Sequence, residues 1–161
     1  MTFPRPPAHF IATALAPVVT QWAQKEEARI LSEGRALTPA EVRDAEAAGV
    51  LQPNAVRVVT GASILWPVSK QLLWLAWRVG LTPGTTIGVT LGHGIFLRDD
   101  YANSRGLLVH ELAHVAQYEK LGGLRAFLRR YLFECLTVGY AAAPLEIEAR
   151  AVERRVMQPG D

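Results

Sequence analysis

The first third of the chain shows apolar and polar positions at the spacing of helices. We predict one helix over residues 9–33, where apolar residues recur at helical intervals until a glycine follows. A second helix is predicted after Thr38, because Thr38 and Glu41 form the capping-box pattern with which many helices begin. Gly49 then supplies the usual stop signal.

Short β-branched stretches in the middle of the chain predict strands. "NAVRVVTG", residues 54–61, is the first of them. "TTIGVTL" and "GIFLRDD", residues 85–91 and 94–100, are two more, and the Gly92-His93-Gly94 sequence indicates a tight turn between them. The alternation of side chains in "GIFLRDD" indicates a surface strand with one packed face.

"SKQLLWLAWRVG", residues 69–80, predicts another helix. Apolar residues cover most of its circumference, so most of it should be buried. We expect the tryptophans of the chain to pack in the core or in an interface rather than to stack on a ligand. They are Trp22, Trp66, Trp74 and Trp77.

The last third of the chain is predicted to be helical. Helical patterns cover residues 104–121 and 124–138, and a final helix begins at Pro144. We therefore predict a single α+β domain, mainly helical, with a small antiparallel sheet packed against the helix of residues 104–121. The helical segment of residues 1–50 should be an accessory part of this domain, and residues 51–161 its core.

The composition is that of a folded domain without a strongly charged partner. The chain has 161 residues, of which 50% are apolar and 20% charged, and a formal net charge of +2. A chain of this length can bury a substantial core. Its basic residues are scattered among acidic neighbours, so we expect no nucleic-acid partner.

Cysteine content and apolar runs exclude further classes of protein. The single cysteine, Cys135, excludes an internal disulfide and a centre of several thiolates, and we expect it to be a buried helix residue. No apolar run reaches the roughly 18 residues needed to cross a bilayer, because Pro67, Lys70 and Gln71 interrupt the longest one. We expect no membrane contact. The signal-peptide pattern of "RPPAHFIATALAPVV" is weak, so we expect a cytoplasmic protein.

"LLVHELAHVAQYEK", residues 107–120, carries the strongest chemical signal. His110 and His114 are about one helical turn apart, so both imidazoles leave the same face and can bind one metal ion. Glu111 lies about 100° further round the helix, where it suits a base acting on a metal-bound water. The composition predicts only about 0.007 chance matches to this HExxH pattern. The alternative is a pair of core histidines satisfied by backbone carbonyls.

A catalytic zinc takes three protein ligands and leaves a position for water, so two histidines need a third ligand. No histidine follows His114, and both His9 and His93 precede it. Downstream, the strongest candidates are Glu146 and Glu148 in the first turns of the last predicted helix. They flank its apolar face on opposite sides, so periodicity does not choose between them. Alternatively, both merely complement the helix dipole.

"HELAHVAQYEKLGG" followed by "GYAAAPLEIEARA" resembles the gluzincin branch of zincin metallopeptidases, and also a group of small, mostly uncharacterised bacterial HExxH domains. The resemblance covers about residues 85–153. It implies a zincin-like core in which a glutamate on a later helix completes the zinc site, and it favours Glu146. In gluzincins an acid often follows this ligand four residues later, but Arg150 stands there in this chain. For Glu148 the corresponding residue is Val152. The resemblance also implies that "GIFLRDD" is a sheet edge along which a peptide lies, and a plain structural strand is the equal alternative.

We therefore predict a small zinc-dependent hydrolase, most simply a metallopeptidase that acts on a peptide or a flexible protein segment. The predicted Zn²⁺ ligands are His110, His114 and Glu146, with Glu148 as the alternative to Glu146. Glu111 would take a proton as the zinc-bound water attacks a carbonyl carbon. The oligomeric state and the cleavage preference are left open by the sequence.

A tyrosine is a further candidate, since tyrosines can stabilise the oxyanion in zinc peptidases. Tyr131 and Tyr140 both precede the predicted third ligand, and we favour Tyr140 for this catalytic role. Its phenol could equally anchor a loop to the core.

Two other functions compete with the hydrolase. One is a non-catalytic zinc-binding structural or interaction domain, in which the metal ties two helices together and metal loss melts the fold. The other is a membrane-apposed enzyme with "ILWPVSKQLLWLAW" resting on lipid.

Overall fold

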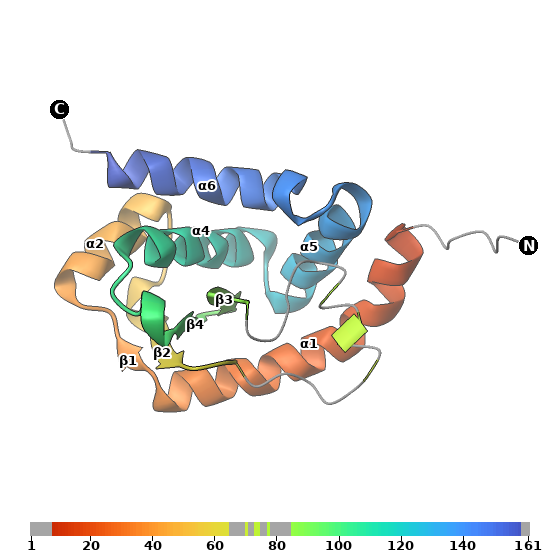
Figure 1. The fold of residues 1–161 in the computed structure, drawn as a ribbon, viewed down its shortest axis with the longest axis horizontal. Helices are drawn as coiled ribbons and strands as arrows, with labels where there is room; N and C mark the ends of the chain where they lie inside the picture. Colours follow the sequence, from red (N-terminus) through yellow and green to blue (C-terminus); the bar gives the residue numbers. More distant parts are fainter. Residues whose placement is uncertain (1–7, 65–69, 71–72, 75–76, 78–84, 159–161) are drawn as a thin grey trace, which may run out of the picture.

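Helices dominate the part of the chain that the computed structural model describes, which is residues 8–64, 70, 73–74, 77 and 85–158 (Figure 1). The helices are α1 (Ala8–Glu33), α2 (Pro39–Ala48), α4 (Arg105–Leu121), α5 (Leu124–Val138) and α6 (Pro144–Met157). The strands are β1 (Arg35–Ala36), β2 (Arg57–Gly61), β3 (Gly88–Leu91) and β4 (Gly94–Arg98). Short 3-10 turns cover Pro53–Ala55, Asp99–Tyr101 and Tyr140–Ala142. The predicted α+β class with a small sheet is confirmed.

The strands form one mixed sheet in the order β1-β2-β4-β3. β1 pairs with β2, and β3 with β4, in antiparallel fashion. β2 and β4 run parallel, with Val58 opposite Ile95. The prediction of an antiparallel sheet was therefore wrong for the central pair. A long connection separates β2 from β4, and such a connection permits parallel pairing, which the pattern within each strand does not reveal.

β4 is the best-buried strand of the sheet. Ile95 and Leu97 pack with residues of α2 and α4, whereas Phe96 packs with residues of α1, and none of the three is more than 1% exposed. Of the two alternatives for this stretch, the structural strand is confirmed and the surface strand at the sheet edge was wrong, because both of its faces are buried and β2 and β3 flank it. The outer strand on this side of the sheet is β3.

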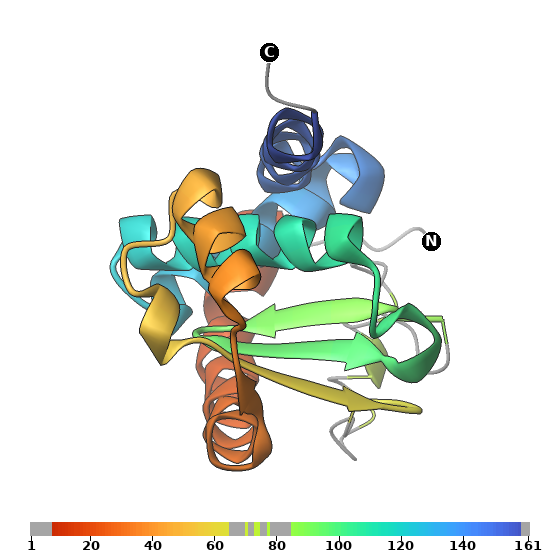
Figure 2. The same cartoon turned by 90° about the vertical axis from the view of Figure 1, so that its left-hand side faces the viewer.

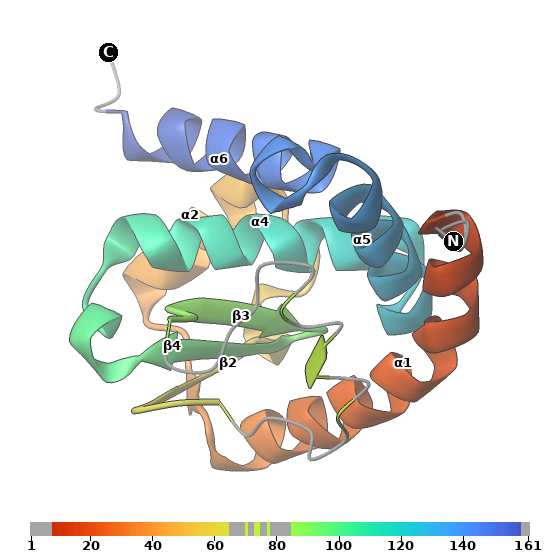
Figure 3. The same ribbon diagram turned by 45° about the vertical axis from the view of Figure 1, so that its right-hand side comes forward.

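The elements stack in layers around the sheet. α1 crosses one face of the sheet, and α4 lies along the opposite face (Figure 2). α6 lies against α4 on the side away from the sheet, and α5 connects these two helices while packing on α1 (Figure 3). α4 is therefore enclosed between the sheet and α6, which explains why its residues from Leu108 to Val115 are all buried.

Local signals set the ends of α2 as predicted, and signals of the same kind set the ends of α4. In α2, Thr38 and Glu41 form a complete capping box, and Gly49 ends the helix in the left-handed conformation with φ 96°. In α4, the Ser104 side chain accepts a hydrogen bond from the Leu107 amide, and Gly122 ends the helix with φ 83°. Both ends of α4, the helix that carries His110 and His114, are thus determined by local capping interactions.

The helix predicted over residues 69–80 falls mostly outside the described residues, as does Trp66. Of the described tryptophans, Trp22 is partly buried against the core. Trp74 and Trp77 are 51% and 64% exposed, so these two do not pack in the core of the chain, and their packing in an interface stays a prediction. Among the described residues, the helices lack the combination of length and apolarity that membrane crossing requires.

Candidate metal centre

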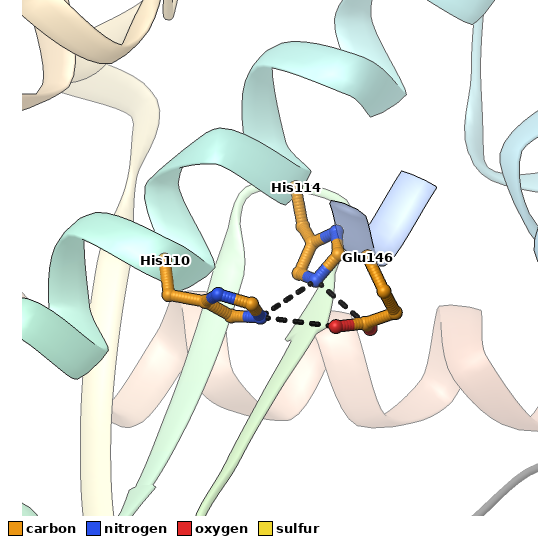
Figure 4. A group of neighbouring side chains, drawn as sticks. All are labelled: His110, His114 and Glu146. Carbon is orange, nitrogen blue, oxygen red and sulfur yellow. Dashed lines mark hydrogen bonds and ion pairs between the residues drawn. The ribbon is translucent and has the colours of Figure 1, made fainter. Parts of the chain in front are cut away.

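The two histidines of α4 and a glutamate from α6 point at one another (Figure 4). The Nε2 atoms of His110 and His114 are 3.2 Å apart. Glu146 reaches both: its Oε2 lies 3.3 Å from His110 Nε2, and its Oε1 lies 3.2 Å from His114 Nε2. Glu146 is only 1% exposed. Among the described residues, these three form the group that could share one metal ion.

Gln117 determines the tautomer of His114. The Gln117 amide nitrogen donates to the Leu145 carbonyl at 2.9 Å and to Glu148 Oε2 at 3.0 Å, and both of these oxygens only accept. The amide oxygen is then the atom 2.8 Å from His114 Nδ1, so Nδ1 carries the proton and Nε2 presents its lone pair. Glu148, the alternative third ligand, therefore lies outside the cluster and supports His114 through Gln117.

A second carboxylate, that of Glu153, lies next to the Nδ1 atom of His110. Glu153 Oε2 lies 3.5 Å from His110 Nδ1, which favours a proton on Nδ1 and leaves the Nε2 lone pair directed at Glu146. Burial lowers the pKa of His110, but the nearby carboxylates, Glu146 first among them, outweigh burial and raise this pKa above its ordinary value. The surroundings of His110 thus attract positive charge.

Glu146 is held as an anion in a buried place. Tyr131 donates a hydrogen bond to Glu146 Oε1 at 2.8 Å. Burial raises the pKa of Glu146, but the imidazoles of His110 and His114 outweigh it and keep the pKa well below its usual range. Oε2 is buried without a hydrogen bond from any residue that the structure describes. Arg150 Nη1 is 3.6 Å from that atom, a distance suited to an ion pair.

These contacts fit a cation better than they fit a set of core side chains. A histidine lone pair and a carboxylate oxygen face each other 3.2 Å apart at His114 and Glu146, although both are acceptors. Glu146 Oε2 is buried without a hydrogen bond from the described residues, and the ion pair with Arg150 at 3.6 Å is long, so a cation between this oxygen and the imidazoles would satisfy it better. Two imidazole nitrogens and one carboxylate oxygen are also a donor set that catalytic zinc sites use.

Glu134 on α5 fixes the start of α6, and with it the position of Glu146. Ala143 is the N-cap residue of α6 and has no side chain that could cap the helix. Instead, Glu134 Oε2 accepts a hydrogen bond from the Leu145 amide at 2.8 Å, and Arg130 Nε donates to Glu134 Oε1 at 2.8 Å. The third member of the cluster is therefore positioned by a contact between two helices.

Glu111 lies beside the cluster without belonging to it. It is 4% exposed, and its Oε2 accepts a hydrogen bond from Thr90 Oγ1 of β3 at 2.6 Å. Gly88, also on β3, approaches so closely that an added Cβ atom would lie 2.5 Å from Glu111 Oε1. β3 therefore holds one oxygen of this carboxylate through Thr90 and leaves room for the other at Gly88.

A cavity and a groove adjoin the cluster of His110, His114 and Glu146. An apolar cavity extends from it into the protein, and a more polar, open groove lies in front of it. Gly88, His110, Glu111 and Tyr140 line both hollows. Glu111 consequently lies where a molecule in the groove would meet the candidate metal centre.

The two candidate tyrosines occupy different places. Tyr131 is partly buried, contacts Glu146, and has a pKa raised well above its usual value by burial. Tyr140 is 40% exposed and lines the mouth shared by the cavity and the groove. Burial and the charge of Glu146 also raise the pKa of Tyr140, so its phenol keeps its proton and can donate a hydrogen bond.

The sequence prediction missed the side chains that support the ligands. Gln117 follows His114 by one helical turn in a nearly uncharged helix, and this spacing is a signal for a side chain on the same face. Glu153 follows Glu146 by two turns, whereas the gluzincin pattern directs attention only to the position of Arg150. The contact of Tyr131 with Glu146 has no comparable sequence signal, because it joins α5 to α6.

Comparisons with protein-family models, with curated proteins and with solved structures find no match to this chain. Functional inference therefore depends on the residues of the site.

Proposed function

We propose that this protein is a zinc-dependent hydrolase, most simply a metallopeptidase. The observation that carries the proposal is the place of Glu111, which lies outside the group formed by His110, His114 and Glu146 yet lines the same cavity. A site that only stabilises the fold needs no buried carboxylate next to its ligands. A hydrolase needs one, as the base that accepts a proton from water.

In the proposed hydrolysis, Glu111 and Tyr140 have different roles. Bound zinc would supply a Lewis acid that lowers the pKa of water towards about 7. Glu111, held by Thr90, accepts the proton from the attacking water and passes it to the leaving amine. Tyr140 at the mouth of the cavity donates a hydrogen bond to the developing oxyanion.

β3 is the strand along which we propose that a peptide lies. It is the outer strand of the sheet on the side of the site, and its residues from Gly88 to Leu91 line the apolar cavity. A main chain in extended form can pair with an outer strand and thereby present a carbonyl group beside Glu111.

A non-catalytic zinc domain is the second candidate. The observation in its favour is that the three predicted ligands join α4 to α6, so that a metal would tie these helices together. In that case metal removal should unfold the chain, because the free energy of metal binding contributes directly to folding.

Metal content tests both candidates. We expect about one zinc per chain, by elemental mass spectrometry, in protein purified without a histidine tag or chelators. Glu146→Ala should lose the zinc, whereas Glu148→Ala should weaken its binding but retain the site, since Glu148 acts through Gln117. A wild-type protein that neither contains zinc nor takes it up contradicts both candidates.

Activity separates the hydrolase from the structural domain. Glu111→Gln should keep zinc and lose turnover of a quenched peptide library by about 10²- to 10⁴-fold. Glu33→Gln, a substitution at an exposed glutamate of α1, is the matched control and should change neither property. Peptide cleavage that is equal in the Glu111→Gln variant and the wild type rules out the proposed base. Zinc binding without any cleavage, together with unfolding on zinc removal, favours the structural domain.

A further inference from the structure

An apolar cavity of about 90 Å³ extends from the candidate metal centre into the protein. Three elements supply its apolar walls. They contribute Val19 and Trp22 from α1, Val89 and Leu91 from β3, and Phe127 and Leu132 from α5. The cavity therefore lies between the sheet and the helices that flank it, next to the cluster.

The cavity opens at the reactive end of the site. Its mouth shares Gly88, His110, Glu111 and Tyr140 with the polar groove. A chain lying in the groove along β3 would therefore pass Glu111 and could send one side chain inward. The polar groups at the mouth and the apolar walls behind them match a peptide, which has a polar main chain and, at some positions, apolar side chains.

An empty apolar space of this kind is unfavourable for stability. The atoms that line a void lose packing contacts, and the loss grows with the volume of the void. Water is a poor occupant of the part away from the histidines and carboxylates, because it needs several polar partners and apolar cavities stay dry. The cavity is thus suited to an apolar group brought in by a ligand.

The volume restricts what can enter. A cavity of roughly 150 Å³ accepts a benzene molecule in a protein core. The cavity described here, at about 90 Å³, is smaller, so a branched aliphatic side chain fits it better than an aromatic one.

We propose that this cavity binds an aliphatic side chain of the substrate adjacent to the bond that is cleaved, and that Val19 and Trp22 of α1 set the size of this side chain. The proposal rests on the hydrolase function proposed above. α1 lies outside residues 85–153, which carry the gluzincin resemblance, so the selective wall belongs to the N-terminal part of this chain.

Peptide cleavage tests the size selection. Zinc-loaded wild-type protein is given quenched peptides that differ only in the residues flanking the cleaved bond. We expect leucine or valine at one flanking position to exceed alanine and aspartate in kcat/KM by about tenfold or more, since one methylene in an apolar pocket changes this ratio by about 10- to 200-fold.

Variants of the cavity wall should change that preference. Trp22→Leu enlarges the cavity and should shift the preference towards phenylalanine by about tenfold. Val19→Phe fills the cavity and should abolish the preference for leucine, while peptides with alanine at that position are still cleaved. If the Val19→Phe variant does not fold, Leu132→Phe fills the cavity from the α5 side and tests the same point. Trp77→Leu replaces an exposed tryptophan and is the matched control, expected to cleave as the wild type does.

A binding measurement keeps the cavity and the hydrolase distinguishable. 4-Methyl-1-pentanol, which carries the side chain of leucine, is titrated into the full chain with and without zinc and followed by amide NMR. We expect shifts around Val19, Val89 and Leu132 in the wild type and their loss in Val19→Phe. Binding of the alcohol without peptide cleavage would support the pocket and contradict the hydrolase function. Cleavage without side-chain preference and without alcohol binding would overturn the pocket alone, and failure of both measurements would overturn both proposals.

Discussion

Gln117 holds His114 in one tautomer: its amide oxygen lies 2.8 Å from His114 Nδ1, and its amide nitrogen is engaged by Leu145 and Glu148. The amide cannot turn over without placing its nitrogen against the imidazole proton. A side chain three residues after the histidine, on the same helix, thus directs the nitrogen that faces the cluster.

Removal of this amide should weaken metal binding. We expect Gln117→Ala to lower zinc affinity by about 10- to 100-fold, because the His114 ring loses the hydrogen bond that fixes its orientation. Competition with a chromogenic chelator measures this change. Gln24→Ala, at an exposed glutamine of α1, serves as the control. An unchanged affinity in Gln117→Ala would show that the imidazole is oriented by packing alone.

Gly88→Ala should separate metal binding from turnover. The added methyl group would lie 2.5 Å from Glu111 Oε1, so the carboxylate must move away from its place beside the cluster. We expect zinc content to stay near that of the wild type while kcat falls by about 10²-fold or more. Gly61→Ala on β2 is the control, because its methyl group would lie at ordinary contact distances, 3.4 Å from Phe96 Cε2 and 3.9 Å from the Ser63 carbonyl oxygen. Full activity in the Gly88→Ala variant would remove Glu111 from the mechanism.

The capping box of α2 should make stability depend on pH. Hydrogen bonds from Arg35 lower the pKa of Glu41 below 4.5, in spite of partial burial. Since the folded pKa is the lower one, the carboxylate stabilises the fold above about pH 4.5, and this contribution is lost as the pH falls through the folded pKa.

Glu41→Gln tests this contribution because glutamine also suits the capping box. We expect the variant to lose about 1 kcal/mol or less of unfolding free energy near neutral pH, since the ion pair is partly exposed. The difference from wild type should shrink when urea unfolding is repeated at about pH 3.5. A difference that is constant with pH would assign the loss to packing.

Cys135 should be unreactive in the folded protein. Burial raises the pKa of its thiol to about 12, and the residue is 2% exposed. We expect alkylation by iodoacetamide at about pH 8, followed by mass spectrometry, to be slower in the folded chain than in urea by orders of magnitude, since the thiolate is the reactive form. Equal rates would show that α5 opens readily.

The sequence predicted those features that depend on neighbouring residues. The ends of α2 and α4 follow from Thr38, Glu41 and Ser104 at their starts and from glycines at their ends, because capping is a local interaction. His110 and His114 were predictable for the same reason, since one helical turn fixes their relative positions.

Features that depend on packing between elements were not predictable. The residue patterns of β2 and β4 indicate which faces of these strands are apolar. They do not indicate that the two strands pair in parallel, and this pairing places β4 inside the sheet. Glu146 and Glu148 flank the apolar face of α6 on opposite sides, so only the packing of α6 on α4 decides which of them reaches the histidines. Glu153 reaches His110 for the same reason.

The start of α6 has a consequence for how the protein tolerates change. Because Glu134 replaces the missing cap at Ala143, we expect a substitution at position 134 to displace the start of α6, and Glu146 with it, without removing a predicted ligand. In a survey of all single variants, position 134 should accept as few replacements as position 146 itself. Glu134 is not one of the predicted ligands, yet we expect it to share their intolerance of substitution because its carboxylate caps the helix that holds Glu146.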